Sequence, residues 1–235
     1  MSALLPLVVT RADPGGAATA ARAAAMGLDV RHLPLFEARA LDWSIPDPAD
    51  FDALLITSAQ AARLAGPGLS RLASLPVYAV GRASADAAAA AGLAIARVGG
   101  TDAQSLVDAM TSSNIGRILW LCGRDRSALD PRGADLVARA CYAVDPVPPP
   151  AGWAEAVAGP AVLLVHSGRG ARRLADLVPT GRERLSLVAI SAAVARAAGA
   201  GWDRIVLAER PDDAAMLAQA HALCHKGRKM GSVER

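Results

Sequence analysis

The sequence predicts an α/β protein made of two similar lobes, each with a parallel sheet covered by helices. Short apolar runs rich in Val, Leu and Ile alternate with Ala-rich helical segments along almost the whole chain, which is typical of parallel sheets with helices on both faces. One strand, hydroxyl and helix pattern also occurs twice, and two extended segments divide the chain. These observations predict two parallel-sheet lobes joined by a two-stranded linker around a cleft.

The expected strands are short apolar runs that end at turn-forming residues. They fall at 5–10, 28–35, 53–57, 76–80, 93–97, 117–122, 141–147, 161–166, 186–190 and 204–207. Asp13 and Pro14 suit the start of a first helix that Gly27 ends, and Thr101 with Gln104 matches a capping box. So many strands are more than one small sheet needs, which favours two sheets.

The second half of the chain repeats the first in the same order. ALLITSAQAARL at 53–64 corresponds to AVLLVHSGRGARRL at 161–174, and PVYAVGRASADAAAAAG at 76–92 corresponds to SLVAISAAVARAAGAG at 186–201. Ser58 then matches Ser167 at a shift of 167 − 58 = 109, and Gly81 matches Ser191 at a shift of 191 − 81 = 110. Two shifts that agree to one residue indicate an internal repeat.

Two extended segments give the expected domain boundaries. LPLFEARAL at 33–41 follows only one strand and one helix, and YAVDPVPPP at 142–150 is rich in proline. If both are linkers, residues 1–35 and 148–235 combine into one lobe, and 36–147 form an inserted lobe that includes the linker strands. A double connection of this kind permits hinge motion about a cleft.

Composition disfavours nucleic acid as a partner. The 25 basic and 22 acidic residues give a net charge of only +3, and aromatic residues make up 3% of the chain. The basic run HKGRK at 225–229 has no aromatic neighbours for base stacking, so a solvated tail is expected there in preference to a nucleic-acid contact.

Cysteine usage and hydropathy predict a cytoplasmic protein without a membrane segment. Cys122, Cys141 and Cys224 are odd in number and lack C-x-x-C spacing, which fits reduced thiols. The opening MSALLPLVVTR has no basic segment typical of a signal peptide, and no apolar run reaches the roughly 20 residues of a membrane span.

Hydroxyl side chains follow several expected strands, where an open parallel sheet places its ligand. They are Thr10, Thr57, Ser58, Ser84, Ser167 and Ser191. Each can instead cap a helix, which contributes about 1 kcal/mol to stability. Together with Arg11, Arg82 and Arg169 near the strand ends, these donors suit a ligand with several carboxylates.

Other kinds of site are disfavoured. The chain lacks a G-x-x-x-x-G-K-[ST] loop, and in the lone GxG after 161–166 Arg173 occupies the position of the third glycine, so nucleotide binding is not expected. His221, Cys224 and His225 could share a helix face as metal ligands, but a solvated face is expected. His166 ends an apolar strand, and without an identifiable Asp or Ser partner it is expected to be a packed histidine. No cofactor and no metal are expected.

Several segments resemble the uroporphyrinogen-III synthase family, in the family's order and over nearly the whole chain. They are VVTRADPGG at 8–16, ITSAQAA at 56–62, YAVGRASADAAAAAG at 78–92, GGTDAQSL at 99–106, the strand of Tyr142, VHSG at 165–168 and VAISAAVARAAGAG at 188–201. The resemblance implies a bilobal fold and the cyclisation of hydroxymethylbilane with inversion of ring D through a spiro intermediate. The enzyme would be a lyase that releases water.

The resemblance also implies roles for individual residues. Tyr142 matches the tyrosine proposed to assist departure of the substrate hydroxyl. The positions expected to bind substrate are Thr10, Arg11, Thr57, Ser58, Gln60, Gly81, Ser84, Ser167, Gly168 and Ser191. The sequence departs from the family at Ser191 and Ala192, where Gly and Pro are common, and at Val194, which replaces a hydroxyl residue; Gln60 takes a position held by other polar residues.

The partners implied are an anionic linear tetrapyrrole and, for its handover, hydroxymethylbilane synthase; a monomer is expected. Two rival interpretations stay open at this point. One is a non-catalytic bilobal binding protein or inactive relative that recognises a polycarboxylate metabolite, although such binding proteins are usually exported. The other is a nucleotide-dependent α/β enzyme.

Overall fold

The computed structural model describes residues 4–100 and 102–226. Thr101, expected to form a capping box, and the 227–229 part of the basic run lie outside these residues. The adjacent Asp102 caps the helix Ala103–Thr111 instead, because its carboxylate accepts the backbone N–H groups of Gln104 at 3.2 Å and Ser105 at 3.0 Å.

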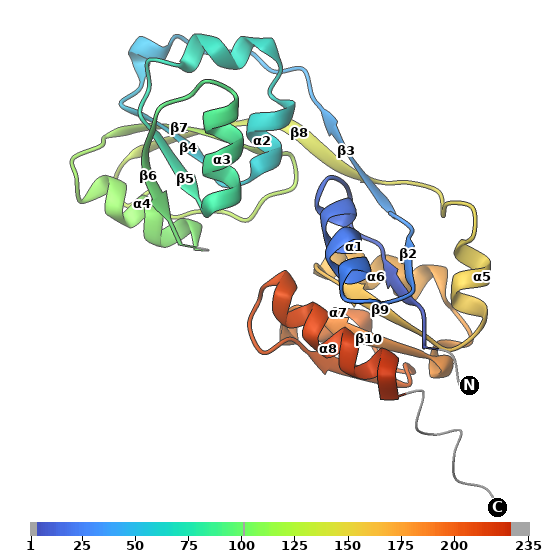
Figure 1. The fold of residues 1–235 in the computed structure, drawn as a ribbon. Coiled ribbons are helices and arrows are strands. Elements are labelled where there is room, and N and C mark those ends of the chain that lie inside the picture. The colour runs from blue at the N-terminus through green and yellow to red at the C-terminus, as the bar shows by residue number, and fades with distance from the viewer. Residues whose placement is uncertain (1–3, 101, 227–235) are drawn as a thin grey trace, which may run out of the picture. The chain divides into compact units, whose positions relative to one another are not determined.

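The chain divides into two compact units, described separately below (Figure 1). Unit 1 comprises Met1–Glu37 and Pro146–Arg235, and unit 2 comprises Ala38–Asp145. The chain passes from one unit to the other within β3 (Phe36–Ala40) and returns within β8 (Asp135–Pro146). These crossings lie two residues from the boundaries expected from the sequence.

Unit 1 contains a five-stranded sheet of order β11-β10-β9-β1-β2, in which every pairing is parallel. Its strands are β1 (Leu7–Val9), β2 (Val30–His32), β9 (Ala161–Val165), β10 (Leu185–Ala189) and β11 (Arg204–Leu207). Its helices are α1 (Gly15–Ala25), α5 (Trp153–Ala158), α6 (Gly168–Leu177), α7 (Ala192–Ala198) and α8 (Asp213–Lys226), with a 3₁₀ turn at Arg182–Arg184.

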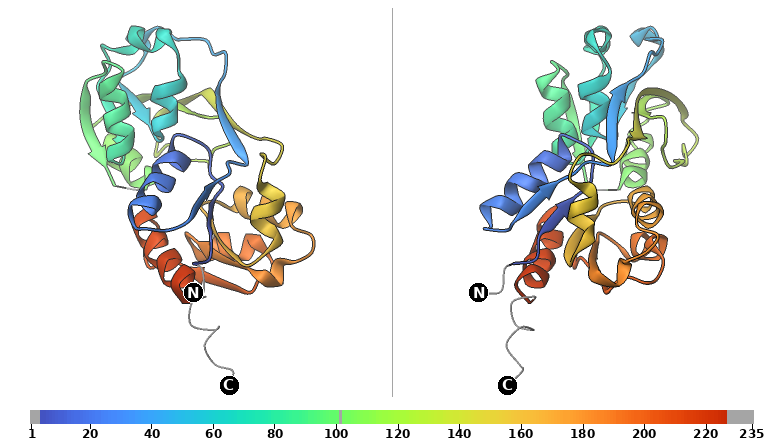
Figure 2. Two further views of the ribbon diagram at one scale, coloured as in Figure 1. Left: turned by 45° about the vertical axis from the view of Figure 1, so that its right-hand side comes forward. Right: turned by 90° about the vertical axis from the view of Figure 1, so that its right-hand side faces the viewer.

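Helices cover both faces of this sheet (Figure 2), so its central strands are apolar throughout. Leu163 packs with Leu174 of α6 on one face, and the next residue, Leu164, packs with Met216 of α8 on the other. This alternation along one strand produces the unbroken apolar runs from which the strands were predicted.

Unit 2 contains a six-stranded sheet of order β3-β8-β7-β4-β5-β6, with parallel pairing from β8 to β6. Its further strands are β4 (Ala53–Ile56), β5 (Val77–Val80), β6 (Ile95–Gly99) and β7 (Arg117–Gly123). Its helices are α2 (Ala59–Leu64), α3 (Arg82–Ala90) and α4 (Ala103–Thr111), with 3₁₀ turns at Pro48–Asp50 and Pro67–Leu72. Apolar clusters again lie on both faces of the sheet.

Both units contain the same sheet, connected in a different order. Without β3, the order β8-β7-β4-β5-β6 in unit 2 corresponds to β2-β1-β9-β10-β11 in unit 1. The repeated segments contribute β4 and β5 to one sheet and β9 and β10 to the other, whereas β1 and β2 at the start of the chain take the places of β7 and β8. The predicted fold class, two similar parallel-sheet α/β lobes, is confirmed.

Two strands differ from the sequence prediction. The segment expected only as an extended linker forms β3, and β8 begins at Asp135 instead of residue 141. Both strands are largely half-buried or exposed and mix charged residues with apolar ones. Their sequences therefore lack the continuous apolar run of a buried central strand.

Candidate functional site

Each sheet has one place where the strand order reverses, and there the carboxyl ends of two adjacent strands form the usual ligand crevice of an open α/β sheet. In unit 2 the reversal falls between β4 and β7, and in unit 1 it falls between β1 and β9. The expected residues Thr57 and Ser58 follow β4, Thr10 and Arg11 follow β1, and Ser167 closely follows β9.

The unit 2 reversal brings together a group that we call the phenol site: Ser58, Gly123 and Tyr142. Ser58 has extended backbone angles and caps α2, since its Oγ accepts the N–H of Gln60 at 3.2 Å. The Ser58 side chain is also hydrogen-bonded to the phenol of Tyr142. Two expected site residues that lie 142 − 58 = 84 positions apart in the chain are therefore in contact.

The environment of Tyr142 keeps its phenol protonated. Burial raises the pKa of Tyr142 because the phenolate would lose hydration, while the hydrogen bond from Ser58 opposes this shift in part. The phenol can therefore donate a hydrogen bond or a proton at neutral pH, from a place fixed by its contacts.

Trp120 of β7 holds Thr57 on the other face of the sheet, where its ring belongs to the apolar cluster that contains Leu55 and Cys122. Its indole Nε1–H donates to Thr57 Oγ1 at 3.1 Å, so the Thr57 hydroxyl proton remains available to another acceptor. The guanidinium of Arg126 lies over the Trp120 ring at 5.6 Å from its centroid. The sequence analysis missed both residues, because Trp120 lies inside an apolar strand and Arg126 in the following loop.

The remaining unit 2 candidates surround the ends of the neighbouring strands. Gly81 precedes α3 with φ +74°, a conformation that favours glycine, and Ser84 is buried in the first turn of that helix. Gln60 is the second residue of α2. These three residues lie near the carboxyl ends of β4 and β5.

The unit 1 reversal is charged, and we call its centre the Asp213 network: Arg11, Thr19, Arg22, His166 and Asp213. The carboxylate of Asp213 accepts a hydrogen bond from Thr19 at 2.7 Å, two from Arg22 at 3.0 and 2.6 Å, and one from His166 Nε2 at 3.0 Å. Arg11 Nη1 lies 3.7 Å from the same carboxylate. The network joins α8 to α1 and to the loops that follow β1 and β9.

These contacts fix two protonation states. Burial alone would raise the pKa of Asp213, but hydrogen bonds from His166, Thr19 and Arg22 outweigh it and hold the pKa well below its usual range. Burial lowers the pKa of His166, and the hydrogen bond to Asp213 only partly opposes that effect. His166 is therefore neutral at pH 7 and donates its Nε2–H to the carboxylate.

His166 is largely buried, as expected of a packed histidine, but it has an acidic partner that the sequence did not identify. Asp213 lies 47 residues after His166 at the start of α8, and no sequence pattern connects the two. The side chain of His166 is 10% exposed, and among the described residues its Nδ1 has no hydrogen-bond partner.

The other unit 1 candidates have structural contacts of their own. Ser167 caps α6 through the N–H of Gly170 at 3.0 Å, and Ser191 caps α7 through the N–H of Val194 at 3.4 Å. Thr10 is buried, and its hydroxyl lies 3.5 Å from the carbonyl oxygen of Leu164. Gly168 is the first residue of α6. The capping alternative considered for these serines therefore holds, and it leaves each hydroxyl proton free to contact a ligand.

Comparison with known proteins assigns the family. Residues 17–218 match the family described as uroporphyrinogen-III synthase HemD. The chain belongs to the uroporphyrinogen-III synthase family. The resemblance noted in the sequence is therefore confirmed, and the match includes Tyr142 and the expected site residues from Thr57 onward, while Thr10 and Arg11 precede it.

Solved structures of uroporphyrinogen-III synthases share the fold. The enzyme from Helicobacter pylori 26695 has a TM-score of 0.67 at 17% identity, covering 94% of this chain and 99% of its own. A mutant of the enzyme from the extremely thermophilic bacterium Thermus thermophilus has a TM-score of 0.53 at 20% identity, covering 95% and 99%. No curated protein sequence matches the chain.

One departure from the uroporphyrinogen-III synthase pattern has a clear structural setting. Val194, which replaces a hydroxyl residue, is 7% exposed and packs in the apolar cluster that contains Leu174 and Trp202. At this position the chain offers the site only the backbone N–H, and that group donates to Ser191.

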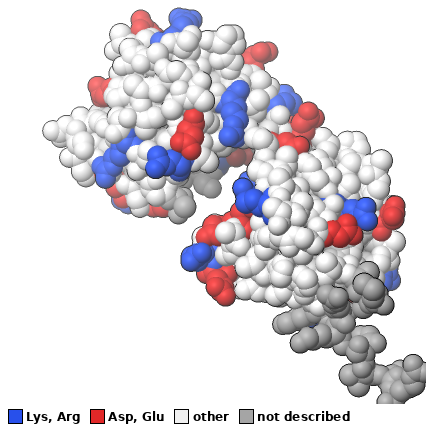
Figure 3. Space-filling model, viewed as in Figure 1, with Lys and Arg blue, Asp and Glu red and all other residues white. Residues whose placement is uncertain are grey.

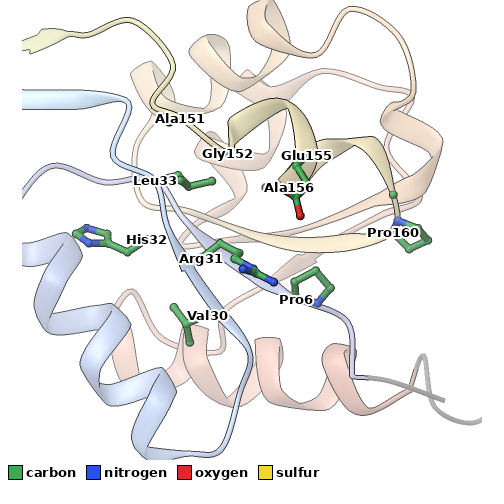
Figure 4. A pocket seen from close by; sticks show the side chains of 11 residues that line it. Pro6, Val30, Arg31, His32, Leu33, Ala151, Gly152, Glu155, Ala156 and Pro160 are labelled. Atoms are coloured by element: carbon green, nitrogen blue, oxygen red, sulfur yellow. The ribbon is translucent and has the colours of Figure 1, made fainter. Parts of the chain in front are cut away.

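A pocket of about 390 Å³ in unit 1 lies away from these residues (Figure 4). It runs along the edge strand β2 and beside α5, from Pro6 and Pro160, which precede β1 and β9, to Leu33, which follows β2. Arg31 and Glu155 are its charged lining residues, and none of the expected site residues lines it.

Within residues 4–100 and 102–226, no cluster of three or more His, Cys, Asp or Glu side chains is arranged to hold a metal ion. The helices of this described part are all too short or too polar to cross a membrane. On the face of each unit seen in Figure 3, basic and acidic side chains are interspersed, in line with the near-balanced net charge.

Proposed function

We propose that this protein converts hydroxymethylbilane to uroporphyrinogen III, inverting ring D through a spiro intermediate and releasing water. Membership of the uroporphyrinogen-III synthase family over residues 17–218 is the observation that supports this function most strongly. It makes the protein an enzyme of tetrapyrrole synthesis and disfavours the non-catalytic binding protein. The reaction class is that of a cyclising lyase.

We infer that Tyr142 is the acid that assists the first step. As the C–O bond of the ring A hydroxymethyl group breaks, the phenol gives its proton to the departing hydroxyl, which leaves as water. The raised pKa of Tyr142 supports this role because it keeps the proton on the phenol until negative charge develops on the leaving oxygen. The proton lost by the ring carbon when the macrocycle closes restores the phenol.

We propose that the strand-end groups predicted from the sequence bind the carboxylates of the substrate. Thr10, Arg11, Thr57, Ser58, Gln60, Gly81, Ser84, Ser167, Gly168 and Ser191 form the proposed binding set. Hydrogen bonds to a charged group contribute roughly 1.5 to 3 kcal/mol each, so several of them can hold a flexible polycarboxylate in one curled geometry.

We further propose that the protein acts as a cytoplasmic monomer that receives its substrate from hydroxymethylbilane synthase. The three cysteines are free and buried, in line with a reducing compartment. Each unit has its own apolar core on both faces of its sheet, which supports a stable single chain. A direct handover would shorten the time in which the bilane closes unaided to the uninverted isomer.

The test is to incubate the purified protein with freshly generated hydroxymethylbilane, oxidise the products and separate the uroporphyrin isomers. We expect isomer III to predominate over a control without enzyme, with no added cofactor or metal. Isomer I alone would contradict the proposed function and return the binding protein or inactive relative as the explanation of the fold.

A further inference from the structure

We propose that Gly123 is a positioning residue of the phenol site, whose missing side chain lets the Tyr142 ring lie across β7 and reach Ser58. The catalytic consequence of this inference depends on the proposed function, but the seating of the ring does not. The sequence pattern does not single out Gly123, and its role emerges only from strand order and register.

The three strands involved are adjacent, with β7 in the middle. Gly123 of β7 is the register partner of Tyr142 on β8. On the other side of β7, Leu121 is the partner of Ile56 on β4, so two residues further along Ser58 comes level with Gly123. To contact Ser58, the Tyr142 side chain must therefore pass over position 123.

The space above Gly123 is filled by the tyrosine ring. A Cβ atom at position 123 would lie 2.9 Å from Cζ, 3.0 Å from Oη and 3.2 Å from Cε2 of Tyr142. The first distance is shorter than real Cβ contacts show, and the other two are tighter than most real contacts. The ring and a side chain at position 123 cannot both keep these places.

The backbone gives no separate reason for glycine here. The φ angle of Gly123 is outside the left-handed region, unlike that of Gly81. The N–H of Arg124 donates to the carbonyl oxygen of Tyr142 at 2.8 Å, which fixes the tyrosine backbone beside β7. The backbone of Tyr142 is fixed beside β7 and its phenol is bonded to Ser58. The ring therefore rests on Gly123, which determines how close the ring lies to the strand.

This arrangement decides which proton is used in the hydrogen bond between Ser58 and Tyr142. Ser58 Oγ accepts the N–H of Gln60, so its own proton can be donated to the Tyr142 oxygen. The phenol proton is then free for a substrate atom. Gly123 acts on the reaction only through the place of Tyr142, which makes it a positioning residue.

The experiment uses the full-length chain with Tyr78→Phe, so that Tyr142 is the single tyrosine. Its phenol is titrated by ultraviolet absorbance with and without Gly123→Ala, and kcat and KM are measured for the same proteins. Gly116→Ala is the matched control: this glycine immediately precedes β7, at the strand's other end, and an added Cβ would meet only Asp52 Oδ2 at an ordinary 3.6 Å.

We expect Gly123→Ala to displace the ring into solvent, so that the phenol pKa falls toward that of an exposed tyrosine. We also expect kcat to fall at least tenfold with a smaller change in KM, and Gly116→Ala to match its parent in all three quantities. Adding Tyr142→Phe to Gly123→Ala should cause no further loss beyond that of Tyr142→Phe alone. An unchanged phenol pKa in Gly123→Ala would overturn the inference.

Two outcomes separate this inference from the proposed function. If the wild type yields only isomer I, the proposed function fails, while the titration still decides whether Gly123 seats the ring. If Gly123→Ala does not fold, the double variant Gly123→Ala with Tyr142→Ala should fold, because the ring that meets the added Cβ is removed. Failure of that double variant to fold would overturn the inference.

Discussion

The two strand-order reversals share a backbone plan and differ in their side chains. In each unit a serine after an apolar strand caps the next helix, Ser58 in unit 2 and Ser167 in unit 1. The residue before the serine differs. In unit 2 it is Thr57, which accepts a hydrogen bond from Trp120, and in unit 1 it is His166, which donates one to Asp213. The repeat has preserved the turn and its cap while the neighbouring partners have diverged.

The divergence separates two electrostatic environments. Charge is concentrated in the Asp213 network, where hydrogen bonds lower the pKa of a carboxyl group and keep arginines in place. The phenol site is built from hydroxyl and phenol groups, and burial raises the pKa of Tyr142. We therefore propose that unit 1 contributes groups that bind anions and that unit 2 contributes the proton donor.

The largest expected effect comes from removing the phenol. Tyr142→Phe should lower kcat roughly a hundredfold, because a positioned general acid contributes about that much or more. KM should change little, since the ring remains. Steady-state kinetics with isomer analysis provides the measurement.

The matched control is Tyr78→Phe, which removes the only other tyrosine of the chain. It should keep the kcat of the wild type. Full turnover by Tyr142→Phe, with circular dichroism showing an intact fold, would end the assignment of Tyr142 as the acid.

The next largest effect should be on stability. Asp213→Asn leaves Arg22 without a counter-charge and weakens the contact to His166. The free energy of unfolding should therefore fall by about 2 kcal/mol. Partial solvent contact of Asp213, whose side chain is 18% exposed, keeps the cost below that of a fully buried pair. Chemical denaturation checks this against Glu183→Gln, which alters an exposed acid that pairs with its neighbour Arg184. Equal midpoints for the two variants would refute the anchoring role.

A smaller effect distinguishes the two caps. Ser58→Ala and Ser167→Ala each remove one capping hydrogen bond and should each cost about 1 kcal/mol. Only Ser58→Ala should also raise the pKa of Tyr142 further, because the hydrogen bond that lowers it is lost. Absorbance titration of both variants in the Tyr78→Phe background is the measurement, and an identical phenol pKa in the two would contradict the Ser58 contact.

The smallest expected effect is a pH dependence of stability. Since burial lowers the pKa of His166 in the folded chain, the unfolded chain binds a proton more readily, and stability falls as pH drops below the ordinary histidine pKa of about 6.5. Asp213 adds a further loss below the ordinary range of aspartate, through its lowered pKa. Between about pH 7.5 and 5.5, the Tm of His166→Gln should fall less than that of the wild type.

His221→Gln is the control for that comparison, because His221 lies partly exposed on α8 and outside the Asp213 network. It should retain the pH dependence of the wild type. A Tm that depends on pH equally in all three proteins would remove His166 as the source.

Much of the fold could be predicted because the central strands are buried on both faces. Runs such as Ala161–Val165 are continuously apolar, and the hydroxyls that follow them mark the strand ends. The repeat indicated two similar sheets. The sequence could not show that β1 and β2 replace β7 and β8 in the strand order, because that exchange depends on long-range pairing.

The candidate site could be predicted only in part, for a related reason. Local rules locate a serine before a helix, and they found Ser58 and Ser167. They do not connect Trp120 with Thr57 or Asp213 with His166, since these contacts join distant segments. Gly123 resembles any glycine at a strand end until the ring above it is seen.

The most direct test of the division between binding and proton transfer is to measure kcat and KM for Arg11→Gln and Tyr142→Phe side by side. Arg22 still pairs with Asp213 in Arg11→Gln, so the network should remain folded. Loss of a carboxylate contact should raise KM with little change in kcat, whereas loss of the acid should lower kcat with little change in KM. A kcat loss of the same size in both variants, with KM unchanged, would contradict the division.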